Sequence, residues 1–157
     1  KAVWLDYCDC HMLDTIAREP LWRHLINYRC GTGHSVSFVG NVHEGPHALN
    51  GRNTTLMRPG MIVTDEPGVY ETDLVGIRIE NELVCVHKAD NQYGTFLGFE
   101  PIMFVPIATS PIVPGVLTKD ELDWLNNYHR QVFEKLAPRL NDEEREWLAK
   151  KCAAIGC

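Results

Sequence analysis

Apolar side chains recur at helical spacing near the start of the chain and in shorter, strand-like runs through its middle. Residues 11–28 place apolar positions three to four residues apart, which predicts a helix. Pro20 lies inside this pattern, so we expect a kink or a break into two short helices. Glycines and prolines then separate β-branched runs that predict strands, most simply of one antiparallel sheet. These runs are residues 36–42, 61–64, 77–79, 83–87 and 99–107.

The last third of the chain returns to helical spacing. Thr118 with Glu121, and then Asn141 with Glu144, form capping-box patterns ahead of amphipathic segments. A connector with prolines and a glycine, residues 110–116, precedes them. The order of helix, sheet and closing helices predicts an α+β class.

Composition excludes several classes of function. The chain has 157 residues, 45% hydrophobic and 23% charged, which suits a globular domain. A net charge of -6 argues against nucleic-acid binding, which needs clustered Lys and Arg. The apolar stretches are too short to span a bilayer, so no membrane contact is expected. The chain begins at Lys1 with neither an initiator Met nor a secretory signal, so we expect it to start inside a longer protein.

The cysteine pattern favours reduced thiols in the cytoplasm. Cys8 and Cys10 are too close for an ordinary disulfide, and Cys85 lies in an apolar strand pattern. Cys8, Cys10 and His11 are residue types that bind zinc, but no second ligand pair follows at finger-like spacing. We therefore expect no disulfide framework and no zinc finger.

Potential metal ligands lie in three segments of strand-and-turn character. Arg78, Glu80 and Glu82 share one face by the period of two, a pattern that normally marks a solvated face. His34 and Glu66 alone carry no stronger signal, so spacing by itself does not define a metal site. The segments are Gly31-Thr32-Gly33-His34, Thr64-Asp65-Glu66-Pro67-Gly68 and residues 76–82.

The combined order of motifs is far more specific. Gly-Thr-Gly-His, Asn-Val-His-Glu-Gly-Pro, Thr-Asp-Glu-Pro-Gly-Val-Tyr and Gly-Ile-Arg-Ile-Glu-Asn together resemble the aminopeptidase P family of pita-bread metallopeptidases. The block Trp-Leu-Asn-Asn-Tyr-His resembles its long, eukaryotic-type branch. The matching segments are residues 31–34, 41–46, 64–70, 76–81 and 124–129, with further likeness at 13–14, 17–18, 99–101 and 105–107.

The resemblance implies a fold and an activity. Residues 1–109 would be the C-terminal part of a pita-bread domain, a curved antiparallel sheet with flanking helices. Residues 110–157 would be the family's helical extension. The implied enzyme removes the N-terminal residue from peptides with proline in second position, works as a homodimer and holds two Mn²⁺ per full-length subunit.

Roles for individual residues follow from the same resemblance. His34 matches a histidine ligand, and Glu66 a carboxylate on the same cation that also takes a proton from the bridging water. Glu80 matches a carboxylate bridging both cations. His43 matches a histidine that donates to the substrate carbonyl, and Arg78 an arginine that holds neighbouring carboxylates.

The chain departs from the family pattern at Cys30 and at the pair Ser35 and Ser37, which stand where the family has glycines. Cys30 occupies a position in the substrate pocket where the family has histidine. The family's two aspartate ligands have no counterpart, since the acids before His34 lack their motif. We therefore expect the first half of the catalytic domain to be missing, at most one weakly bound cation, and no activity of this chain alone.

Two other functional interpretations stay open. One is a prolidase-type dipeptidase of the same fold, which would not explain residues 124–129. The other is a non-catalytic pita-bread domain that binds peptide or protein. Among the remaining histidines, we expect His47 to lie in a surface loop, His87 to cap or leave a strand, and His129 to pack on a helix.

Overall fold

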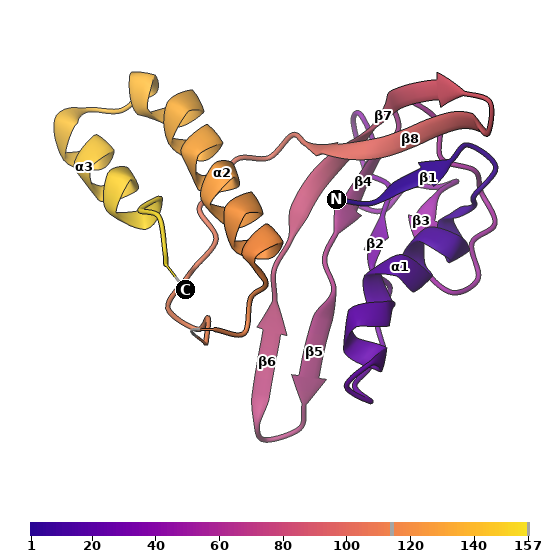
Figure 1. Ribbon diagram of the computed structural model, residues 1–157, viewed down its shortest axis with the longest axis horizontal. Helices are drawn as coiled ribbons and strands as arrows, with labels where there is room; N and C mark the ends of the chain where they lie inside the picture. Colours follow the sequence, from indigo (N-terminus) through magenta and orange to yellow (C-terminus); the bar gives the residue numbers. More distant parts are fainter. Residues whose placement is uncertain (114, 157) are drawn as a thin grey trace. The chain divides into compact units, whose positions relative to one another are not determined.

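The computed structural model describes residues 1–113 and 115–156. The chain divides into two compact units, Lys1–Met103 and Phe104–Cys157, and Figure 1 shows strands confined to the first. The strands are β1 Val3–Leu5, β2 Gly33–His34, β3 Ala48–Leu49, β4 Ile62–Asp65, β5 Gly68–Glu71, β6 Val75–Arg78, β7 Asn81–Asn91 and β8 Gly94–Pro101. The helices are α1 Cys10–Trp22, α2 Lys119–Leu136 and α3 Asp142–Lys151, with a 3₁₀ turn, η1, at Ala137–Arg139.

The strands of the first unit form three antiparallel sheets within the described residues. The main sheet has the order β1-β8-β7-β4, while β2 pairs with β3 and β5 pairs with β6. The α+β class and the antiparallel pairing are confirmed, but the expectation of one sheet is wrong. β5 and β6 pair with each other, and the chain then crosses to β7 in the main sheet.

Helix α1 covers residues 10–22 without a break. Asp9 caps its N-terminus by accepting from the Met12 N–H. Pro20 lies in the last turn, where a missing N–H costs only one hydrogen bond, so the predicted break is wrong. The helix ends at Trp22, six residues before the predicted limit at Tyr28.

Strand predictions succeeded where a partner strand exists. Residues 61–64, 77–79 and 83–87 overlap β4, β6 and β7. Residues 36–42 instead form a loop in which the Phe38 side chain is fully exposed, so that prediction is wrong. β8 ends at Pro101, which makes the predicted strand 99–107 wrong in its second half.

The core of the first unit lies between α1 and the sheets. Its buried side chains come from β1, α1, β3, β4, β7 and β8 and from the loop between β3 and β4; they are Trp4, Cys10, Leu13, Leu49, Met57, Val63, Cys85 and Leu97. Cys8, Cys10, Cys30, Cys85 and Cys152 are free thiols, as expected, and Cys157 lies outside the described residues. Burial raises the pKa of the Cys85 thiol to about 11.

The second unit is helical. Both predicted capping boxes are confirmed, with Thr118 and Glu121 at the start of α2 and Asn141 and Glu144 at the start of α3. Its core comprises Tyr128, Val132 and Leu148, with partly buried apolar neighbours. Across residues 1–113 and 115–156, none of the helices has the length and apolar character needed to cross a membrane.

Candidate metallopeptidase site

The candidate site begins where β2 and β4 lie unusually close. A Cβ atom on Gly33 would lie 1.7 Å from the Thr64 carbonyl oxygen, so only glycine permits this approach. The next residue, His34, donates its backbone N–H to Thr64 Oγ1 at 3.0 Å. The glycine thus brings the His34 imidazole beside the end of β4.

Glu66 follows β4 and turns its carboxylate toward His34. Its backbone N–H donates to the Thr32 carbonyl at 2.7 Å, which fixes the turn. Its Oε1 accepts from Thr64 Oγ1 at 2.8 Å and lies 2.9 Å from His34 Nε2. Glu66 is 8% exposed. Burial also raises the pKa of the adjacent Asp65 carboxyl, with a smaller contribution from the charge of Glu66.

Arg78, at the end of β6, holds the other oxygen of this carboxylate. Its guanidinium forms an ion pair with Glu66 Oε2 and lies 3.5 Å from Cys30 Sγ and 5.5 Å from the Tyr70 ring centre. A Cβ atom on Gly68 would lie 2.8 Å from Arg78 Nε. A glycine opposite Arg78 therefore gives the guanidinium room to reach Glu66.

His43 reaches the same place from the loop between β2 and β3. Its ring centre lies 3.9 Å from that of His34, edge to face at 74°. A cavity of about 290 Å³ joins these groups. It is lined by Cys30, Gly31, Gly33, His34, His43, Ala48, Asn50, Glu66 and Arg78.

Glu80 is placed differently from the other candidate residues. It lies between the end of β6 and the start of β7, is exposed, and does not line the cavity. Among the described residues, His, Cys, Asp and Glu form no group of three arranged to hold a metal ion. His34 Nε2 and Glu66 Oε1 are thus two adjacent donors, with a chemistry that suits one divalent cation but does not complete its coordination.

His47 corrects a sequence-based prediction. It is 8% exposed rather than on the surface, and its Nε2 lies 2.7 Å from the Ile62 carbonyl, to which it donates. Its backbone carbonyl accepts from the Ser35 N–H at 3.2 Å. His47 therefore ties the far end of the His43 loop to β4. No sequence signal marks this role, because it depends on a carbonyl in another strand.

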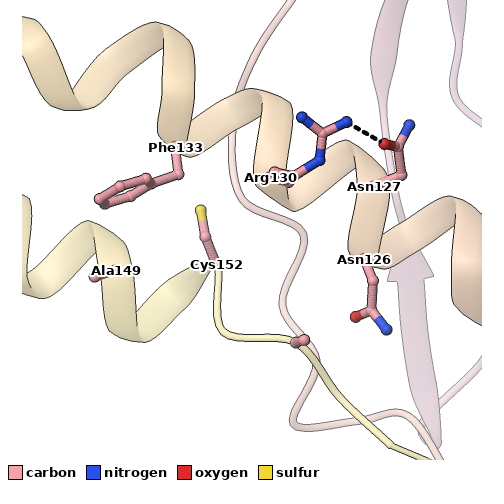
Figure 2. Close-up of a pocket in the computed structure, with 7 residues that line it drawn as sticks. Asn126, Asn127, Arg130, Phe133, Ala149 and Cys152 are labelled. Carbon is pink, nitrogen blue, oxygen red and sulfur yellow. Dashed lines mark hydrogen bonds between the residues drawn. The ribbon is translucent and has the colours of Figure 1, made fainter.

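A larger cavity, about 550 Å³, lies in the second unit. Figure 2 shows Phe133 and Cys152 on one side of it and Arg130 bonded to Asn127 on the other. Its lining residues are Asn126, Asn127, Arg130, Phe133, Ala149, Cys152 and Ala154. Among the described residues that line it, none carries an imidazole or a carboxylate, so these residues supply neither an acid-base pair nor a metal-binding set.

Two family models cover most of the chain. Residues 6–87 match metallopeptidase family M24, and residues 95–155 match the C-terminal region of peptidase M24. The boundary between the two compact units falls after Met103. The division of the whole protein into domains at residues 1–109 and 110–157 stays a prediction. The fold, the motif order and these matches define a pita-bread metallopeptidase.

Known proteins with similar sequences or structures indicate which branch of this class the chain resembles. Aminopeptidase P1 of Lotus japonicus is 43% identical over 99% of this chain and 24% of its own length. Aminopeptidase P2 of Arabidopsis thaliana is 46% identical over 94% and 22%. The X-prolyl aminopeptidase of Caenorhabditis elegans, a cytosolic enzyme with a di-nuclear active site, superposes with a TM-score of 0.88 at 36% identity, covering 99% of this chain and 26% of its own.

The chain belongs to metallopeptidase family M24 and, within it, to the aminopeptidase P family. It spans about a quarter of the length of the relatives it matches.

Proposed function

We propose that this chain forms the C-terminal part of the catalytic domain of a metal-dependent Xaa-Pro aminopeptidase. The whole enzyme would remove the N-terminal residue from peptides that have proline in second position. The contact between His34 Nε2 and Glu66 Oε1, inside a cavity that also holds His43 and Arg78, carries the proposal.

His34 and Glu66 would hold one divalent cation, and Glu80 would add a carboxylate in the whole protein. An imidazole with carboxylate oxygens suits Mn²⁺. A bound pair of such cations acidifies water and polarises a peptide carbonyl. The donors within this chain fit one end of that site.

The chain's own residues have distinct tasks in the proposed reaction. Glu66 accepts a proton on its carboxylate, and Arg78 keeps that carboxylate oriented through Oε2. His43 donates an imidazole N–H to the substrate carbonyl oxygen as negative charge develops there. Cys30 lines the cavity beside Arg78 and replaces a bulkier imidazole, which would change the preference for the residue before proline.

For the isolated chain, we propose weak binding of at most one Mn²⁺ and no peptidase activity. The two aspartate ligands implied by the resemblance have no counterpart among its residues. Calorimetric titration with Mn²⁺ tests this part of the proposal. Two tight sites per chain would contradict the ligand assignment.

The proposed setting is a cytoplasmic homodimer acting on Xaa-Pro peptides. The described cysteines are free thiols, and the Caenorhabditis elegans relative is a cytosolic enzyme, which supports this compartment. Exposed apolar side chains of the β5–β6 hairpin, including Leu74, Val75 and Ile77, support association of this chain with a second copy. Light scattering at micromolar concentration decides between dimer and monomer.

The decisive experiment assays the whole protein with Mn²⁺ on matched peptides. Release of the first residue from a Xaa-Pro tripeptide, with a matched Xaa-Ala tripeptide left intact, supports the proposal. Cleavage restricted to Xaa-Pro dipeptides would indicate a prolidase-type dipeptidase. Peptide binding without cleavage, at full Mn²⁺ occupancy, would indicate a non-catalytic binding domain.

A further inference from the structure

A buried ion pair on α1, Asp14 with Arg18, contacts the chain segment that leads into the cavity. Arg18 Nε donates to Asp14 Oδ2 at 2.8 Å, one helical turn apart. The Arg18 and Asp14 side chains are only 12% and 3% exposed. Arg23, the residue directly after α1, pairs with Glu19 at the same spacing, but those side chains are 72% and 45% exposed. Residues 14–23 therefore contain two acid–arginine pairs at the same spacing, one buried and one exposed to solvent.

The remaining donors of Arg18 bind the segment that enters the site. Its Nη1 donates to the Tyr28 carbonyl at 2.7 Å, and its Nη2 donates to the Cys30 carbonyl at 2.8 Å. The guanidinium also lies 4.0 Å from the centre of the Tyr28 ring. A planar group with several fixed donors can satisfy these carbonyls and the Asp14 carboxylate together, which an ammonium cannot.

Asp14 reaches the other side of the site through Thr32. Its Oδ1 accepts a hydrogen bond of 2.5 Å from Thr32 Oγ1, which also contacts the Tyr28 hydroxyl. The carbonyl of Thr32 accepts the Glu66 N–H at 2.7 Å. Asp14, Thr32 and Tyr28 are each no more than 2% exposed. One buried carboxylate is thus linked to Cys30 through Arg18 and to Glu66 through Thr32.

We propose that Asp14 and Arg18 are positioning residues that set the placement of Cys30, His34 and Glu66 around the cavity. Neither side chain lines the cavity, so each acts through the backbone of residues 28–32. Part of this inference, the effect on turnover, rests on the proposed function.

Hydrogen exchange of the 157-residue chain tests the placement without any metal or substrate. The variants are Arg18→Lys, which keeps the charge but not the planar fork, and Thr32→Val, which keeps the shape but removes the hydroxyl. Arg23→Lys is the matched control on the exposed pair. We expect exchange of the Thr32 and Glu66 amides to accelerate about tenfold or more in both variants. The β7–β8 amides and the control should change less than about twofold.

Two results would overturn the inference. One is unchanged protection of the Thr32 and Glu66 amides in both variants. The other is an equal acceleration across the β7–β8 ladder, which would mean a loss of global stability alone.

Steady-state kinetics of the whole protein provide the second readout. Because Arg18→Ala no longer holds the backbone of residues 28–32 in place, it should lower kcat by a larger factor than it raises KM. Added guanidinium should restore part of kcat. A whole protein with no activity would reject the proposed function while the exchange result still decides the placement. Unchanged kcat in an active Arg18→Ala enzyme would reject the positioning role.

Discussion

His34 Nε2 lies 2.9 Å from Oε1 of Glu66, a contact between the end of β2 and the turn after β4. The close approach of the two strands at Gly33 makes it possible. The other oxygen of the same carboxylate binds Arg78. Each carboxylate oxygen of Glu66 therefore contacts a different side chain of the site. We expect the site to be more sensitive to replacement of this carboxylate than to any other single conservative substitution.

Glu66→Gln in the whole protein should reduce kcat/KM for a Xaa-Pro peptide by about 100-fold or more. The amide keeps the shape but cannot accept a proton, and it binds cations and Arg78 weakly. The measurement combines kcat/KM with metal content. Glu71→Gln, on the exposed end of β5, is the control and should behave as the parent. Activity within about twofold of the parent in Glu66→Gln would contradict the proton-transfer role.

His43→Ala should separate substrate activation from metal binding. We expect metal content to stay unchanged while kcat/KM falls by about 100-fold, since an imidazole donor to the carbonyl oxygen is lost. His24→Ala, an exposed histidine beyond α1, is the matched control. Wild-type turnover in His43→Ala would show that this imidazole only packs against His34.

Local signals in the sequence predicted the starts of α2 and α3 correctly. The boxes at Thr118 and Asn141 need only a partner three residues away, so the sequence contains the whole interaction. The strand predicted at residues 36–42, which include the exposed Phe38 and Val39, was wrong, because β-branched and aromatic residues form a strand only where another strand pairs with them. The prediction that His47 lies on the surface was wrong for a similar reason: its hydrogen-bond acceptor, the Ile62 carbonyl, is 15 residues away in the sequence.

The candidate site was predictable only in part. Motif order pointed to His34, His43, Glu66 and Arg78, which line one cavity. The position of Glu80 could not be predicted from the sequence, because the alternation of side chains with a period of two holds only along a continuous strand. The chain instead leaves β6 after Arg78 and enters the main sheet at Asn81.

His47→Ala should destabilise the chain by about 2 kcal/mol, because it leaves the Ile62 carbonyl without its buried donor and opens a small cavity. Denaturation by urea gives the free energy of unfolding. His24→Ala should stay within about 0.5 kcal/mol of the parent. Equal stabilities of the two variants would mean that the buried hydrogen bond at His47 contributes nothing net.

The second unit contains a histidine whose protonation should affect stability. His129 is fully buried on α2, and its Nε2 accepts the Ile107 N–H at 3.1 Å. Accepting at Nε2 requires the neutral ring with its proton on Nδ1. Burial lowers the pKa of His129 below the ordinary value of 6.5.

The folded state therefore binds fewer protons at His129 than the unfolded state does, so acid favours unfolding. The stabilisation is complete above pH 6.5 and is lost as the pH falls toward the lower pKa of the folded state. We expect the protection factor of the Ile107 amide to fall between about pH 6.5 and about pH 5.5. His129→Gln keeps an acceptor for this N–H but cannot titrate, so its protection factor should stay constant over the same range. An equal fall in His129→Gln would assign the pH dependence to other groups.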